Sequence, residues 1–124
     1  MYYTVFVIRH TLVSMQVTGQ PDPSMVPRYV GINTFARLPY YECVERKIDI
    51  GVLGIPFDGG CTFRAGARFG PESIRRSSRL LRQYNPAQDK YPFKYNQVSD
   101  MGDVVCTPFD NSLAVSQIYE KVTE

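Results

Sequence analysis

A nearly continuous run of apolar positions lies near the middle of the chain, over residues 48–55. Asp49 is its one charged residue, and Pro56 follows directly after it. Such a run is typical of a parallel β-strand that is buried on both faces of its sheet. Pro56 has no N–H group to give to a strand ladder, so it ends the strand. The pattern predicts a central parallel strand over residues 48–55.

A helix is predicted after this strand, over residues 71–84. Pro71 stands at the favoured first position of a helix, and Ile74, Ser78 and Leu81 then share one helical face. Asn-Pro at positions 85–86 ends the pattern.

A second strand and a second helix follow. The strand is predicted over 101–105 and is ended by Thr107-Pro108. Asp110 or Asn111 is placed to cap the helix. Its apolar face then continues to the end of the chain, through Val115, Ile118, Tyr119 and Val122.

The order strand, helix, strand, helix predicts an α/β fold with a parallel sheet. Two strands and two helices leave apolar faces and a strand edge uncovered, so the pattern predicts an incomplete sheet. We divide the chain into an unassigned N-terminal extension at residues 1–26, an extended arm at 27–47, and a strand–helix–strand–helix portion at 48–124 that is truncated at its C-terminus.

Composition changes this picture little. A hydrophobic fraction of 44%, a charged fraction of 21% and a net charge of +2 are typical of a folded globular chain and favour neither a nucleic-acid nor a membrane partner. A cytoplasmic location is expected. The first 21 residues contain no acid but do contain Arg9 and His10, which leaves a mitochondrial presequence as the alternative.

Candidate chemistry concentrates in a Gly-rich loop at residues 57–70, between the first strand and the first helix. In open α/β sheets, ligands bind at this edge. The loop matches neither a Walker A nor a dinucleotide fingerprint. Asp58 could bind a cationic substrate or support a metal site. It could instead accept hydrogen bonds from the backbone of the following turn. The same alternatives apply to Asp100 and Asp103. The candidate residues for the rim of an active site are Asp58, Gly59, Gly60, Arg64, Gly66 and Arg68.

Six arginines lie between Arg64 and Arg82, against the single acid Glu72. They could form an anion-binding stripe, or they could pair with acids elsewhere in the fold. We favour the second interpretation because no nucleic-acid motif accompanies them. His10 is the only histidine, and the three cysteines lie far apart in sequence, so neither residue type predicts a metal cluster.

The same segments resemble a known family. Residues 51–60 (Gly-Val-Leu-Gly-Ile-Pro-Phe-Asp-Gly-Gly), 63–71 (Phe-Arg-Ala-Gly-Ala-Arg-Phe-Gly-Pro), 74–75 (Ile-Arg) and 100–103 (Asp-Met-Gly-Asp) look like the opening of agmatinase-type ureohydrolases in the arginase family. Pro-Arg-Tyr at 27–29 and Phe-Ala-Arg-Leu-Pro at 35–39 look like the N-terminal arm of its agmatinase and guanidino-acid hydrolase branch.

This resemblance implies a three-layer α/β/α sandwich and a homo-oligomer that hydrolyses agmatine or a guanidino acid to urea and an amine. It also implies two bridged manganese ions that activate water. The family's ligand motifs, Gly-Gly-Asp-His, Asp-x-His-x-Asp and a later Asp-x-Asp, do not occur in this chain. We therefore assign it no catalytic or metal-binding residue and predict that it is inactive alone. Alternatives are a catalytically dead interaction module that docks on full-length subunits, and a small anion-binding α/β module that uses the arginines at 64–82.

Overall fold

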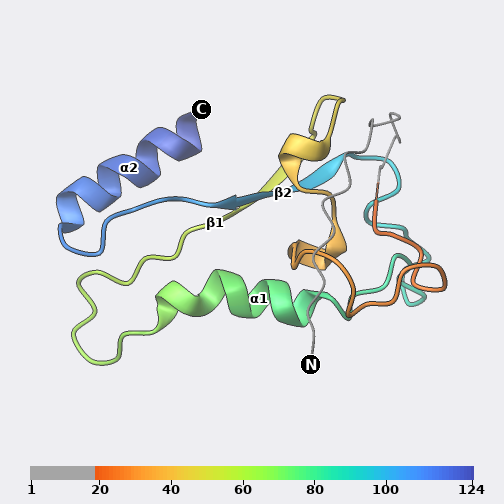
Figure 1. Ribbon diagram of the computed structural model, residues 1–124, viewed down its shortest axis with the longest axis horizontal. Helices are drawn as coiled ribbons and strands as arrows, with labels where there is room; N and C mark the ends of the chain where they lie inside the picture. Colours follow the sequence, from red (N-terminus) through yellow and green to blue (C-terminus); the bar gives the residue numbers. More distant parts are fainter. Residues whose placement is uncertain (1–18) are drawn as a thin grey trace, which may run out of the picture.

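The computed structural model describes residues 19–124, and His10 and the possible presequence lie outside them. Figure 1 shows the predicted order of strand, helix, strand, helix. The regular elements are β1 (Ile50–Gly54), α1 (Gly70–Ser78), β2 (Val98–Asp103) and α2 (Asn111–Thr123). Three single turns of 3-10 helix accompany them, η1 (Phe35–Arg37), η2 (Tyr41–Cys43) and η3 (Ala67–Phe69).

The two strands pair in parallel, as predicted. The prediction of a strand over 48–55 that is buried on both faces was wrong in part, because β1 is shorter and Ile50 is 48% exposed in the two-stranded sheet of residues 19–124. Ile50 lies opposite Val98, and the register shifts between Val52 and Gly54. The prediction for the second strand was wrong at its start, because β2 begins at Val98, before the predicted position 101. The first residues of β2 include Ser99 and Asp100, which sequence patterning does not count as core positions. Both are nevertheless fully buried, since their polar groups find partners inside the fold.

Helix α1 is shorter than the predicted helix over 71–84 and ends at Ser78. The hydroxyl of Ser78 accepts a hydrogen bond from Ala36 N at 2.7 Å and donates one to the Arg75 carbonyl at 2.7 Å. The next residues form i→i+3 turns instead of continuing the helix. The predicted apolar face is also wrong in part, because Ser78 is buried while Ile74 is 59% exposed. The arm therefore contacts α1 at the residue where the helix ends.

The arm packs against the chain's own core. Ala36, Leu38 and Val98 form this core, and Phe35 packs at its margin. A sharp turn at Ala36 and Arg37, with φ of 51° and 59°, directs the chain into the core. The arm then reaches the outer edge of β2, where Asp100 N donates to the Pro39 carbonyl at 3.0 Å. This edge of the sheet is therefore covered.

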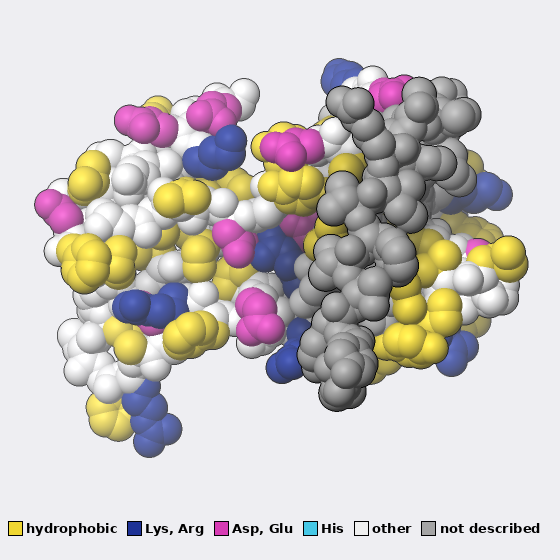
Figure 2. All heavy atoms as spheres, in the orientation of Figure 1, with side chains coloured by type: hydrophobic (Ala, Val, Ile, Leu, Met, Phe, Trp, Pro, Cys, Tyr) yellow, Lys and Arg dark blue, Asp and Glu magenta, His cyan; other side chains and the backbone are white. Residues whose placement is uncertain are grey.

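Helix α2 begins as the sequence predicts. The carboxylate of Asp110 accepts a hydrogen bond from Leu113 N at 3.0 Å and caps the helix. Ala114 is the one residue of α2 that is fully buried. Apolar side chains remain exposed over the end of the molecule that carries α2 (Figure 2), among them Phe109, Leu113, Val115, Tyr119 and Val122. Within residues 19–124, no helix is long and apolar enough to cross a membrane.

Candidate functional site

The loop from β1 to α1 is closed by one carboxylate, that of Asp58. Asp58 is 8% exposed and accepts hydrogen bonds from Gly66 N at 2.7 Å and from the Nε of Arg68 at 2.6 Å. The Nη2 of Arg68 completes a two-nitrogen ion pair at 2.5 Å. Asp58 therefore ties the start of the loop to its end, just before α1.

These contacts stabilise the charged forms of Asp58 and Arg68. The hydrogen bond from Arg68, together with the backbone N–H of Gly66, lowers the pKa of the Asp58 carboxyl from 3.8 to about 2. The same pairing raises the pKa of Arg68. At neutral pH, both oxygens of Asp58 carry charge and are already occupied by donors. Asp58 is therefore built to hold the loop, and a cation could reach it only by displacing Arg68.

The structure brings part of the predicted rim together. Asp58, Gly66 and Arg68 form the closed loop. Gly59 lies against α2, where an added Cβ would collide with the side chain of Asn111. Gly60, the next candidate, has a φ of +81° that favours glycine at the turn.

Arg64, also predicted at the rim, contacts neither Asp58 nor any other acid within residues 19–124. Its guanidinium lies 5.0 Å from the centre of the Phe63 ring, in a cation–π contact. The Phe63 side chain is itself largely exposed, so this contact leaves Arg64 at the surface of the loop.

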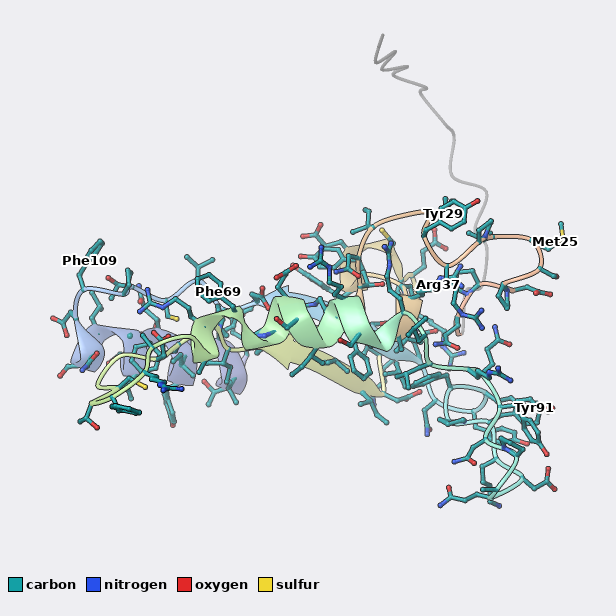
Figure 3. All side chains as sticks on the ribbon, turned by 90° about the horizontal axis from the view of Figure 1, so that it is seen from below. Met25, Tyr29, Arg37, Phe69, Tyr91 and Phe109 are labelled. Atoms are coloured by element: carbon teal, nitrogen blue, oxygen red, sulfur yellow. The ribbon has the colours of Figure 1, made fainter. Side chains whose placement is uncertain are left out.

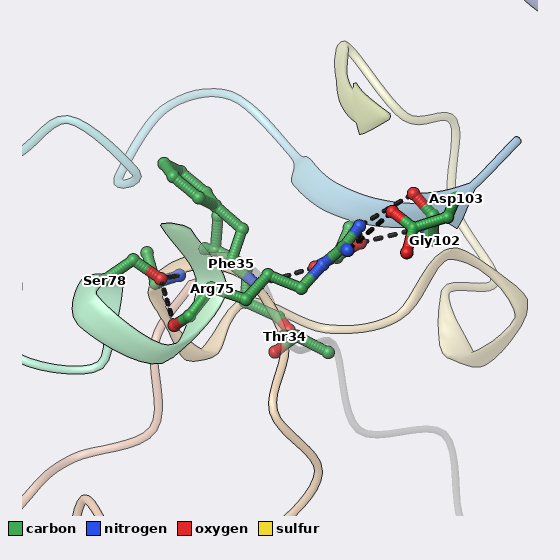
Figure 4. A network of polar contacts seen from close by, with 9 residues as sticks. Thr34, Phe35, Arg75, Ser78, Gly102 and Asp103 are labelled. Carbon is green, nitrogen blue, oxygen red and sulfur yellow. Dashed lines mark hydrogen bonds and ion pairs between the residues drawn. The ribbon is translucent and has the colours of Figure 1, made fainter. Parts of the chain in front are cut away.

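A second ionic site, which sequence analysis did not assemble, joins α1 to the end of β2. The Nε and Nη2 of Arg75 donate to the two oxygens of Asp100 at 2.8 and 2.9 Å. Its Nη1 donates to Asp103 at 2.6 Å, and its Nη2 also donates to the Gly102 carbonyl at 2.7 Å. Figure 4 shows this guanidinium extended along β2. One arginine thus holds the C-terminal end of the strand.

Asp100 is the centre of this site because the arm also binds to it. Phe35 N donates to its Oδ2 at 2.6 Å, and Gly102 N donates to its Oδ1 at 2.8 Å. Burial by itself raises the pKa of the Asp100 carboxyl, but the bonds from Arg75 and from these backbone groups outweigh burial and lower it. The bond to Asp100 also raises the pKa of Arg75. The arm, α1 and β2 are therefore joined through one carboxylate.

The residues present do not fit a two-metal centre. Within residues 19–124, no three His, Cys, Asp or Glu side chains lie close enough together to hold a metal ion. The carboxylates nearest the C-terminal ends of the strands, those of Asp58, Asp100 and Asp103, are all paired with guanidinium groups. A dinuclear centre needs clustered carboxylates or imidazoles that are free to coordinate.

Comparison with known proteins places this arrangement in a family. Residues 48–124 match the Arginase family. The chain belongs to this family, and its parallel strands with a Gly-rich loop and helix are part of the arginase-like α/β fold. The predicted family and fold class are confirmed.

The relatives are longer proteins. The chain is 39% identical over 89 residues to guanidinopropionase of Pseudomonas aeruginosa, covering 72% of the chain and 28% of that protein. It is 37% identical over 105 residues to the human mitochondrial guanidino acid hydrolase, covering 82% of the chain and 30% of that protein. The structure of proclavaminate amidinohydrolase from Streptomyces clavuligerus aligns with a TM-score of 0.71 and 38% identity, over 78% of this chain and 32% of that one. The chain thus spans about a third or less of these proteins.

Proposed function

We propose that this chain forms the first portion of a hydrolase that cleaves a guanidino compound, agmatine or a guanidino acid, to urea and an amine. The observation that carries the proposal is the structural match to an amidinohydrolase at a TM-score of 0.71, because it extends over most of the chain. The names of the relatives, guanidinopropionase and guanidino acid hydrolase, support a guanidino substrate. Segments outside this chain would supply the manganese ligands, and the chain alone is inactive.

The role of this portion is to shape one wall of the substrate pocket. The Asp58–Arg68 pair holds the loop at the C-terminal end of β1, which is the edge where ligands bind in open α/β sheets. The Arg75–Asp100 pair fixes the end of β2 beside it. Both pairs are complete within the chain, so the wall is organised before other segments pack against it.

The apolar surfaces left open support the same proposal. A parallel sheet is stable when both faces and both edges are covered. Here the arm covers the outer edge of β2, while residues 19–124 place no strand on the far edge of β1. The hollow between β1 and α1, lined by Val52, Leu53 and Ile74, is also apolar and open. Further strands and helices of a complete subunit would cover these surfaces. The complete subunits would then assemble into a homo-oligomer.

The names of the relatives also bear on where in the cell this protein is located. The name of the human guanidino acid hydrolase favours a mitochondrial location over the cytoplasmic one. The segment that would carry the presequence, residues 1–18, lies outside the described part of the chain.

A hybrid enzyme tests the proposal. Residues 27–124 replace the matching segment of proclavaminate amidinohydrolase, and the 124-residue chain is assayed in parallel. We expect the hybrid to keep its manganese through dialysis and to release urea. We expect the chain alone to retain no metal pair and to give no urea in added manganese.

Two outcomes would contradict the proposal. The first is a hybrid that folds and binds manganese but has no amidinohydrolase activity. The second is retained metal or urea release by the chain alone. If instead the chain binds a full-length relative without contributing to activity, the interaction-module alternative is correct. In the hybrid, Asp58→Asn should lower activity through loss of the loop, while Glu72→Gln on the exposed first turn of α1 serves as the matched control.

A further inference from the structure

A cavity lined by arginines lies between the arm and the segment that follows α1. Its volume is about 660 Å³. Three arginines line it, Arg28 and Arg37 from the arm and Arg82 from the segment after α1. Apolar walls come from Pro21, Leu81 and Tyr84. Figure 3 shows Arg37 close to the C-terminal end of α1, where these two segments meet.

The arginines of this cavity keep donors free. Arg37 is 8% exposed, and its Nη2 donates to the Val26 carbonyl at 2.7 Å. Within residues 19–124, its other guanidinium nitrogens have no acceptor. The guanidiniums of Arg28 and Arg82 have neither a hydrogen bond nor an ion pair in that part of the chain. This contrasts with Arg68 and Arg75, whose charges are neutralised by aspartates.

Within residues 19–124, no carboxylate forms an ion pair with these three guanidinium groups. None of the residues lining the cavity is acidic. The nearest acids in sequence accept hydrogen bonds from other side chains, Asp22 from Ser24 at 2.7 Å and Asp89 from Tyr84 at 3.0 Å. The first 21 residues contain no Asp or Glu, so the segment outside the described residues cannot supply one. Three like charges around one cavity repel each other, and a bound anion would offset that repulsion.

We propose that this cavity is a binding site for a small organic anion, with a carboxylate or phosphate head group and an apolar body. Guanidinium groups match both head groups through paired N–H donors. The proline, leucine and tyrosine walls are suited to the apolar body of such a ligand. The site is separate from the loop closed by Asp58 and Arg68, because that loop precedes α1 and the cavity follows it. A nine-residue helix separates the two by about 13 Å.

Titration of the full chain with phenyl phosphate, followed by calorimetry at low ionic strength, tests this site. Benzoate replaces phenyl phosphate to compare the two head groups, inorganic phosphate removes the apolar body, and benzyl alcohol removes the charge. We expect saturable binding of phenyl phosphate, benzoate or both, weaker binding of inorganic phosphate, and none of benzyl alcohol. The head group that binds more tightly identifies the class of the natural ligand.

The double variant Arg28→Gln with Arg82→Gln should weaken this binding by about tenfold or more, because each charged hydrogen bond contributes a factor of that order. Neither side chain makes a hydrogen bond within residues 19–124, so folding should be unaffected. The matched control, Arg46→Gln with Arg76→Gln, removes the same charge outside the cavity and should bind like the parent chain. No saturable binding of either organic anion, equal weakening in the control, or equal affinity for inorganic phosphate would each overturn the proposal.

Discussion

The two ends of this molecule differ in how completely they are packed. At the end that carries the arm, Leu38 is 1% exposed, and Asp100 joins three segments through hydrogen bonds. At the end that carries α2, Leu113 is 50% exposed, and Ala114 is the only buried residue of the helix. The sheet runs between them, so the same two strands serve a closed region and an open one (Figure 1).

This difference shows which interactions the chain completes by itself. The closed end depends on contacts between residues 19–40 and residues 75–103, all of which lie in the chain. The open end exposes apolar area that would favour burial by about 25 cal/mol per Å². We therefore expect stability to be unequal along the chain, with local opening much easier at α2 than at the arm.

The largest expected effect comes from Arg75→Ala. This change leaves the buried carboxylate of Asp100 without its ion-pair partner, which costs about 3–5 kcal/mol in comparable cases. We expect the arm to detach from β2 and the amides of residues 35–38 to lose protection in hydrogen exchange.

Arg76→Ala is the control for this prediction, because Arg76 lies on the exposed side of the same helix and should change stability by less than about 0.5 kcal/mol. If Arg75→Ala had an effect as small as its control, Asp100 would not be the point that joins the arm, α1 and β2.

A matched pair of leucines compares the two ends directly. Leu38→Ala removes a fully buried side chain and should cost about 2–5 kcal/mol of unfolding free energy. Leu113→Ala removes a half-exposed one and should cost less than about 1 kcal/mol. Urea unfolding, or hydrogen exchange at β2 if unfolding is not two-state, measures both. In the hybrid enzyme, the cost of Leu113→Ala should rise if other segments cover α2, and an unchanged cost would argue against that packing.

The parts of this fold that follow local rules could be predicted from the sequence. The apolar run of β1, the parallel pairing and the cap at Asp110 each depend on neighbouring residues or on element order. The end of α1 could not be predicted, because Ser78 is held by Ala36, far away in the sequence. The early start of β2 was missed for the same reason, since burial of Asp100 requires Arg75 and Phe35.

The candidate site, too, could be predicted from the sequence only in part. The Gly-rich loop and Asp58 are visible in the sequence because they lie between a strand and a helix. The choice of Arg68 as the partner of Asp58, with Arg64 left against Phe63, depends on how the loop closes. Residue spacing alone does not distinguish the two arginines.

A pH titration of Asp58 distinguishes the effect of Arg68 on its pKa from that of Arg64. The pKa of Asp58 falls from 3.8 to about 2 in the folded chain, so the unfolded state binds more protons as the pH drops. The stability contributed by this pair is complete above about pH 4 and is lost as the pH falls toward 2. We expect the carbon resonance of the Asp58 carboxyl to titrate near 2 in the parent, and closer to 3.8 in Arg68→Gln. Arg64→Gln should leave the midpoint unchanged, and an equal shift in both variants would assign the effect to general charge.

The smallest expected effect is at the start of α2. Asp110→Ala removes the side chain that accepts from Leu113 N, and loss of such a cap costs about 1 kcal/mol of helix stability. Because α2 buries little apolar surface, tertiary packing cannot offset this loss, and the first turn should fray. Circular dichroism should show a small loss of helix, and exchange should quicken at residues 111–115 while β2 is unaffected. Ser112→Ala keeps the cap and is the control. A cooperative loss of protection that reached the arm would show that the two ends unfold together. It would contradict the expectation that α2 opens locally while the end with the arm stays folded.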